Sequence, residues 1–124
     1  MRGSLADVPS TIDSPEITIR EAEWDDIHIG FESYRDRVDM RPLLKGLPDD
    51  RCQSPHWGYV LKGRLRVDTG EGEEIIEAGD AYYLKPGHTG VVEAGTELVE
   101  FSPKDLYAKT MEVVNRNFAE MEKG

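Results

Sequence analysis

Short apolar segments that recur at regular intervals, each ended by glycine, proline or aspartate, constrain the fold of this chain most strongly. About eight of them occur between residues 16 and 102, among them EITIREA and IHIGFESY. Apolar and polar residues alternate within the segments, which is typical of half-buried strands. Turn signals such as TGEGEE separate them, and no helical pattern intervenes. The sequence therefore predicts an all-β sandwich or barrel.

The two ends of the chain differ from this central region. Residues 1–15 are rich in Pro, Ser, Thr and Asp, so we expect a flexible N-terminal arm before a barrel that spans residues 16–102. Residues 103–122 instead predict an amphipathic helix, with Ser102 as its cap. The apolar residues of this helix are spaced for one face: Tyr107, Met111, Val114, Phe118 and Met121. We expect that face to pack on the barrel or to close a dimer.

The charge of the chain excludes two classes of partner. Its 124 residues include 15 basic and 25 acidic ones, which gives a formal net charge of -10. Nucleic-acid binders need a clustered basic surface and anionic membranes attract basic segments, so we expect neither partner. No apolar run approaches the ~18 residues needed to cross a bilayer. The lone cysteine and the absence of a signal-like N-terminus favour the cytoplasm.

Metal-competent side chains occur near two turns. Cys52 and His56 lie four residues apart in DDRCQSPHWGYVLKGRL, and His88 follows Pro86 and Gly87. If the strand is regular, Cys52 and His56 share a face with Asp50. A buried cysteine that acts as a small apolar residue, and histidines that only hydrogen-bond to backbone or carboxylate, remain the alternative.

These segments resemble the motifs of the cupin family over residues 40–102. In the first motif, GYVLKG is the closing part and Gly63 takes the place of its final glycine. Counting back, the family's two histidines and glutamate are replaced in this chain by Asp50, Cys52 and His56. In the second motif, Gly79 and Gly87 match the family's glycines. Its proline, histidine and asparagine are replaced by Lys85, Gly90 and Ala94. The resemblance implies a cupin-type β-barrel (a double-stranded β-helix, or jelly roll) with an N-terminal arm and a C-terminal α-helix.

The departures from the motif leave an unusual set of ligands. Cys52, His56 and His88 can converge inside the barrel as metal ligands. One thiolate and two imidazoles favour zinc over iron or copper, with water, Asp50 or Glu100 in the fourth position. No catalytic residue is assigned.

Several other side chains are candidates for the site. One of the adjacent Tyr82 and Tyr83 must point inward, where it could orient a substrate. A substrate carboxylate could be bound by the guanidinium groups of Arg51, Arg64 or Arg66. The alternation of the strand favours a position toward solvent for Arg64 and Arg66. His28 has no evident partner and is expected at the surface.

Two main functions stay open at this stage. The resemblance implies a metal-dependent isomerase, lyase or dioxygenase that acts on a small, often carboxylate-bearing molecule. The alternative is a non-catalytic domain that binds or senses a small molecule without metal, and a structural dimer without ligand is a third possibility. The resemblance also implies a homodimer.

Overall fold

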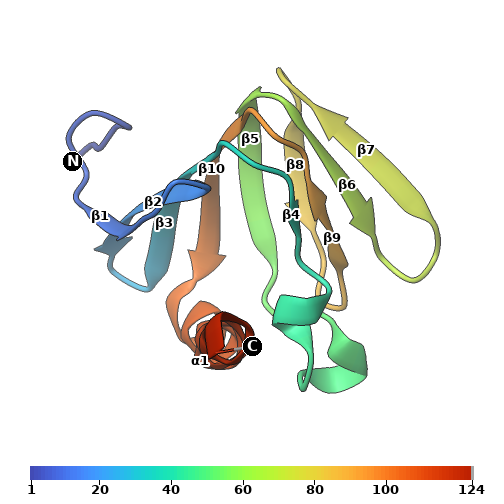
Figure 1. The fold of residues 1–124 in the computed structure, drawn as a ribbon. Coiled ribbons are helices and arrows are strands. Elements are labelled where there is room, and N and C mark those ends of the chain that lie inside the picture. The colour runs from blue at the N-terminus through green and yellow to red at the C-terminus, as the bar shows by residue number, and fades with distance from the viewer. Residues whose placement is uncertain (124) are drawn as a thin grey trace.

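The computed structural model describes residues 1–123, which form two antiparallel β-sheets that face each other and one C-terminal helix (Figure 1). The larger sheet has six strands in the spatial order β1 (Ser10–Asp13), β2 (Ile17–Trp24), β3 (Ile27–Tyr34), β10 (Thr96–Pro103), β5 (His56–Lys62) and β8 (Ala81–Leu84). The smaller sheet has four, in the order β4 (Val38–Asp39), β9 (Thr89–Val92), β6 (Arg64–Asp68) and β7 (Glu73–Glu77). The predicted all-β jelly roll is confirmed.

The two sheets are not closed into a barrel. Every ladder between named strands joins neighbours of the same sheet, and tight turns such as the one at Gly63 carry the chain from one sheet to the other. The edge strands do not pair across the sheets: β1 and β8 in the larger sheet, β4 and β7 in the smaller one. The predicted barrel is therefore a sandwich with open edges.

The side chains that alternate inward from both sheets form the main core. Along β6 the even spacing of Leu65 and Val67 buries both, while the residues between them are more exposed. They meet the inner residues of the larger sheet, of which Val60 is 0% and Leu98 2% exposed. This core fills the end of the sandwich away from the C-terminal helix, and polar side chains occupy the end nearer to it.

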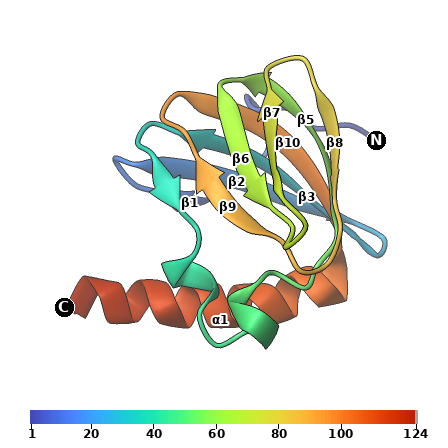
Figure 2. The same cartoon turned by 90° about the vertical axis from the view of Figure 1, so that its right-hand side faces the viewer.

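Helix α1 (Lys104–Lys123) closes that opposite end. Figure 2 shows it lying across the lower ends of the strands, with its C-terminal part extending beyond them. Val114 is buried against the short 3-10 helix η1 (Pro42–Leu44) and Thr110 is buried beside Cys52, whereas Phe118 and Met121 are 46% and 55% exposed. Only the first half of the predicted apolar face packs on the sandwich.

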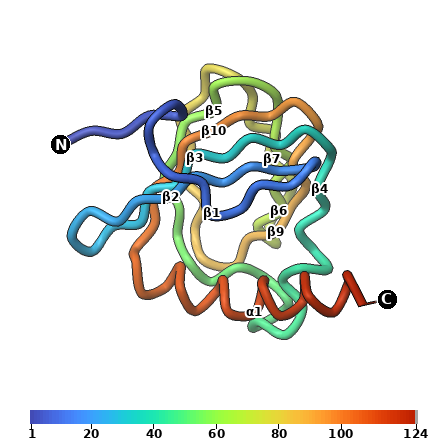
Figure 3. Tube along the Cα trace, turned by 60° about the vertical axis from the view of Figure 1, so that its left-hand side comes forward, coloured from blue at the N-terminus to red at the C-terminus, as the bar shows by residue number. Residues whose placement is uncertain are grey.

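The N-terminal arm is shorter than the sequence predicted. Strand β1 (Ser10–Asp13) lies within residues 1–15 and pairs with β2 (Figure 3). Val8 is buried, and its carbonyl accepts a hydrogen bond of 2.9 Å from Arg20. The alternation of this strand is hidden among Pro, Ser and Asp residues, which are typical of loops.

In residues 1–123, no helix is long and apolar enough to span a bilayer.

Gly63 tests whether the crossing between the sheets requires a residue without Cβ. Its φ is +84°, and a Cβ would lie 2.5 Å from Thr96 Cα. Thr96 is 0% exposed and cannot move aside. We expect Gly63→Ala to lower the free energy of unfolding by about 3 kcal/mol in urea titrations.

Gly70→Ala is the matched control for Gly63→Ala. Gly70 has a similar φ of +89° but nothing within 4 Å of its Cβ position. The control therefore carries only the backbone strain of about 1 kcal/mol. Equal losses in the two variants would show that contact with Thr96 does not matter.

Candidate metal centre

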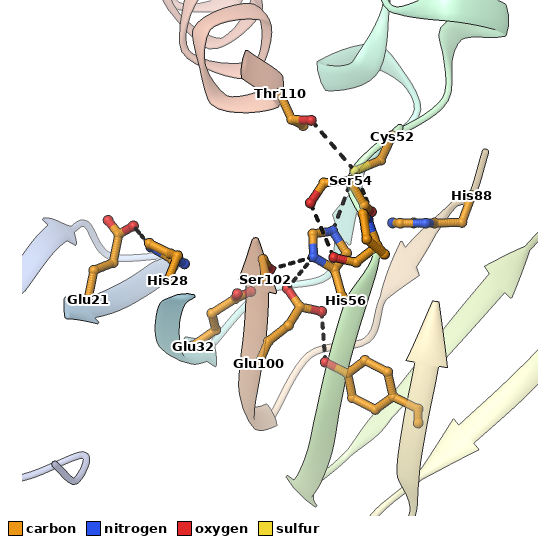
Figure 4. Close-up of polar contacts among 12 residues, drawn as sticks. Glu21, His28, Glu32, Cys52, Ser54, His56, His88, Glu100, Ser102 and Thr110 are labelled. Atoms are coloured by element: carbon orange, nitrogen blue, oxygen red, sulfur yellow. Dashed lines mark hydrogen bonds and ion pairs between the residues drawn. The ribbon is translucent and has the colours of Figure 1, made fainter. Parts of the chain in front are cut away.

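The structure brings the three predicted ligand residues together. Cys52, His56 and His88 each offer one ligand atom, and these atoms all lie within 4.8 Å of one another. Cys52 Sγ is 3.4 Å from His56 Nε2, and the two imidazole rings meet at 68° with centroids 4.9 Å apart. All three residues are buried, with at most 7% exposure (Figure 4). Their convergence is an observed property of the fold, while their role as ligands stays a prediction.

A backbone bridge, and not the regular strand assumed from the sequence, positions Cys52. Strand β5 begins at His56, and Cys52 forms an isolated antiparallel bridge with His88. The Cys52 amide donates to the His88 carbonyl at 2.8 Å, and the His88 amide donates in return at 3.3 Å. Pro55, which lacks an amide hydrogen, separates this bridge from β5.

Each histidine has one ring nitrogen fixed by a neighbour and presents the other to the cluster. His88 Nδ1 lies 2.7 Å from the carbonyl of Lys85, which can only accept, so Nδ1 carries the proton. His56 Nδ1 lies 2.6 Å from Ser102 Oγ, a fully buried hydroxyl on β10. Metal-binding histidines have this arrangement, in which the outer partner sets the tautomer and the ring orientation.

Burial sets the protonation of the three groups. It lowers the pKa of His56 and of His88 to about 4, so both imidazoles are neutral at physiological pH. It also raises the pKa of the Cys52 thiol to about 11. The neutral imidazoles are ready to bind a cation, and the thiol would lose its proton on binding.

The donor set fits a tetrahedral divalent cation with one open position. Two imidazole nitrogens and one sulfur supply three corners, as in zinc sites that keep an exchangeable ligand. The two predicted protein candidates for the fourth position do not reach the cluster. Asp50 is exposed and accepts a hydrogen bond from the Gly46 amide, and the Glu100 carboxylate lies 3.8 Å from His56 Nδ1, the nitrogen that faces away from Cys52. Of the predicted candidates for the fourth position, only water is left.

Buried carboxyl groups lie beside the cluster on the inner face of the larger sheet. Glu32 and Glu100 come from the adjacent strands β3 and β10, and each accepts a hydrogen bond from a tyrosine hydroxyl, Tyr34 and Tyr82 respectively. Tyr82 is therefore the inward member of the tyrosine pair, and Tyr83 is 52% exposed. Glu32 shares a face with Tyr34 and lies opposite Ile27, Ile29 and Phe31, so the apolar alternation of β3 gave no signal for it.

The two carboxyl groups share one environment. Loss of solvation, followed by the charge of Glu100, raises the pKa of Glu32 from 4.5 to about 8. Loss of solvation also raises the pKa of Glu100, to about 7. The pair therefore retains protons at a pH at which exposed carboxyl groups are ionised.

The prediction for His28 is wrong. His28, expected at the surface, is 5% exposed and pairs with Glu21 on β2, which lies diagonally across from it, opposite Gly30. The preference of Arg64 and Arg66 for solvent is confirmed, since their side chains are 46% and 40% exposed. Arg51 donates to the carbonyls of Asp68 and Gly87, and the other two lie near acidic side chains of β7: Arg64 near Glu77 and Arg66 near Glu73.

Comparisons with known proteins identify the fold. No protein-family profile and no curated protein sequence matches the chain. Among solved structures it is similar to an RmlC-like cupin from Shewanella frigidimarina, with a TM-score of 0.58, 11% identity, and 82% of this chain and 88% of that chain covered. The polyketide cyclase RemF from Streptomyces resistomycificus has a TM-score of 0.58 at 15% identity, with 84% and 79% covered. Ectoine synthase from P. lautus has a TM-score of 0.56 at 12% identity, with 84% and 78% covered.

The chain therefore has the cupin fold, as its motifs led us to expect. At these identities the similarity establishes the fold alone, and the function has to be argued from the site.

Glu32→Gln tests the buried carboxyl pair. Because folding raises the pKa of Glu32 from 4.5 to about 8, the stability it contributes is complete below pH 4.5 and is lost as the pH rises toward 8. We expect the free energy of unfolding of the unaltered protein to fall by on the order of 2 kcal/mol more than that of Glu32→Gln between about pH 5 and pH 8. Parallel pH profiles in urea titrations would contradict this assignment.

Proposed function

We propose that the protein binds a divalent metal, zinc above others, through Cys52, His56 and His88, and that it binds a small molecule beside it. The observation that supports this most is the convergence of three ligand atoms within 4.8 Å, with both imidazoles oriented by their outer nitrogens. A thiolate disfavours hard cations such as magnesium, and the mixed sulfur and nitrogen set suits zinc.

The inner face of the larger sheet supplies the groups that would contact the small molecule. Tyr82 donates to Glu100 at 2.8 Å, and Glu100 lies next to His56, so a hydroxyl and a carboxyl group flank the metal ligands. A bound zinc would supply Lewis-acid chemistry. Glu100 and Tyr82 would orient the substrate by hydrogen bonds, and a substrate carboxylate would be held by the cation. Isomerase, lyase or dioxygenase chemistry would suit this arrangement.

A non-catalytic binding or sensing protein is the second candidate. Helix α1 covers the cluster, since Thr110 Oγ1 lies 3.9 Å from Cys52 Sγ and Tyr107 lies edge-on to His56. A covered site slows the exchange of substrate and product, which suits a sensor better than an enzyme. A ligand that raises the melting temperature without being converted would favour this candidate. A cytoplasmic location, where Cys52 would stay reduced, fits both candidates.

Elemental analysis of the purified protein tests the proposed metal. We expect close to one zinc per chain, and loss of most of it in His56→Ala and His88→Ala, because two donors cannot hold the ion tightly. In cobalt-substituted protein, Cys52→Ser should remove the sulfur-to-metal charge-transfer band.

His28→Gln is the matched control for the metal variants. His28 is equally buried but lies outside the cluster, so this variant should keep its metal. Near-ultraviolet circular dichroism would confirm that each variant is folded. Stoichiometric metal in a folded His56→Ala, His88→Ala double variant would overturn the proposed site.

We also propose that two copies associate through the outer face of the larger sheet. The aromatic side chains of this face are exposed and adjacent across the strands: Trp57 48%, Tyr59 43%, Tyr83 52% and Phe101 37%. Trp57 stacks on Tyr83 with ring centroids 5.3 Å apart. Two molecules of net charge -10 repel each other, and this uncharged aromatic patch is where they can meet without opposing like charges.

Trp57→Glu tests this interface. The change places a carboxylate at the centre of the patch in each molecule, and the two carboxylates repel each other across the interface. Sedimentation velocity should therefore show a monomer in place of a dimer. Phe118→Glu changes an equally exposed residue at the free end of helix α1 and should leave the dimer intact. The reverse result would place the interface on the helix, and a monomeric unaltered protein would refute the dimer.

A further inference from the structure

Helix α1 closes a site that has almost no surface of its own. Cys52, His56 and His88 are all buried, so a small molecule does not reach them in this conformation. Thr110 of the helix lies against Cys52, and Figure 4 shows it pointing from the helix toward the sulfur. Tyr107, one turn earlier, lies edge-on to His56. The helix that covers the cluster therefore has to move before a small molecule binds there.

The helix belongs to a separate, smaller core. This second apolar cluster, the helix cluster, consists of Leu43, Leu44, Cys52 and Val114. Within residues 1–123, no buried residue belongs to both the helix cluster and the main core, and α1 contributes nothing to the main core. Loss of the helix cluster would therefore leave the packing between the two sheets in place.

Helix α1 is held at only a few places. Of its 20 residues, only Thr110 and Val114 are buried. Asn117 fastens its second half, because its Nδ2 donates to the carbonyls of Leu43 and Lys45 at 2.8 and 2.7 Å. Beyond this amide the helix extends past the strands (Figure 2). An isolated helix of this length is marginally stable in water, so α1 would lose much of its structure once detached.

We propose that helix α1 is a lid, held closed by Asn117 and the helix cluster, and that it detaches while the two sheets stay folded. Its detachment uncovers Cys52 and both histidines and provides the route by which a metal ion and a small molecule enter. Proteins open locally in units that bury little apolar surface, at a lower cost than global unfolding. The route rests on the proposed function, whereas the opening itself does not.

Cys52 reports on the lid because it is the one cysteine of the chain and is buried beneath the helix. The test follows the reaction of metal-free protein with excess dithiobis(nitrobenzoate) at several urea concentrations below the unfolding transition. When closing is faster than modification, the observed rate is proportional to the fraction of open molecules.

We expect Cys52 to react at least about tenfold faster than global unfolding allows. The rate should also depend less steeply on urea than global unfolding does, because detachment of the helix exposes less surface. A rate equal to that set by global unfolding, with the same urea dependence, would overturn the proposal.

Asn117→Ala should increase the rate of Cys52 modification by about tenfold, because the carbonyls of Leu43 and Lys45 lose their donor. Alanine favours a helix more than asparagine does, so a faster reaction could not come from a weaker helix. Asn115→Ala is the matched control, since Asn115 is exposed on the same helix and donates to neither carbonyl. It should not increase the rate. An unchanged rate in Asn117→Ala would show that the helix and η1 move as one body, and the lid would be refuted.

The rate of zinc uptake by metal-free protein tests the route. Asn117→Ala should take up zinc faster by the same factor as it reacts with the thiol reagent, with an unchanged final zinc content. Faster thiol modification without faster uptake would show that zinc enters by another path and would overturn the route. Protein that binds no zinc refutes the proposed metal, and the thiol measurements still decide whether the lid opens.

Discussion

The backbone bridge between Cys52 and His88 is the interaction on which the candidate site depends. Its two hydrogen bonds tie the loop before β5 to the turn before β9, and so place a sulfur and an imidazole from distant parts of the chain side by side. His56 joins them because β5 starts at this residue and β10 holds its outer nitrogen through Ser102. Without the bridge, Cys52 would lie in an irregular loop with no fixed relation to either histidine.

The inner face of the larger sheet divides into an apolar and a polar half. Toward one end, Val60 and Leu98 meet the smaller sheet and provide the hydrophobic stabilisation of the fold. Toward helix α1, the same face carries the ionisable side chains of the site. His28, Glu32 and His56 are buried there, and the Glu100 side chain is 14% exposed. Burying such groups costs free energy that apolar residues would not, and proteins retain such departures mainly at functional sites.

Local patterns in the sequence predicted the elements well, because alternation and helical spacing are properties of neighbouring residues. They located most of the strands, though not β1, and the start of helix α1 within one residue. Cys52 converges with both histidines as predicted, but through an isolated bridge and not through a regular strand. They failed where the outcome depended on register. Glu21 and His28 meet because β2 and β3 pair in one register, and Asp50 turns outward because Asp49 and Asp50 adopt left-handed backbone conformations. Neither cause can be read from residue spacing alone. The same holds for the first half of helix α1, whose burial depends on where η1 lies.

X-ray absorption spectroscopy of the zinc-loaded protein measures the proposed metal ligands directly. We expect one sulfur at about 2.3 Å and lighter atoms at about 2.0–2.1 Å, two of them imidazole nitrogens. A shell of nitrogen and oxygen only, with no sulfur scattering, would show that Cys52 is a buried apolar residue and not a ligand.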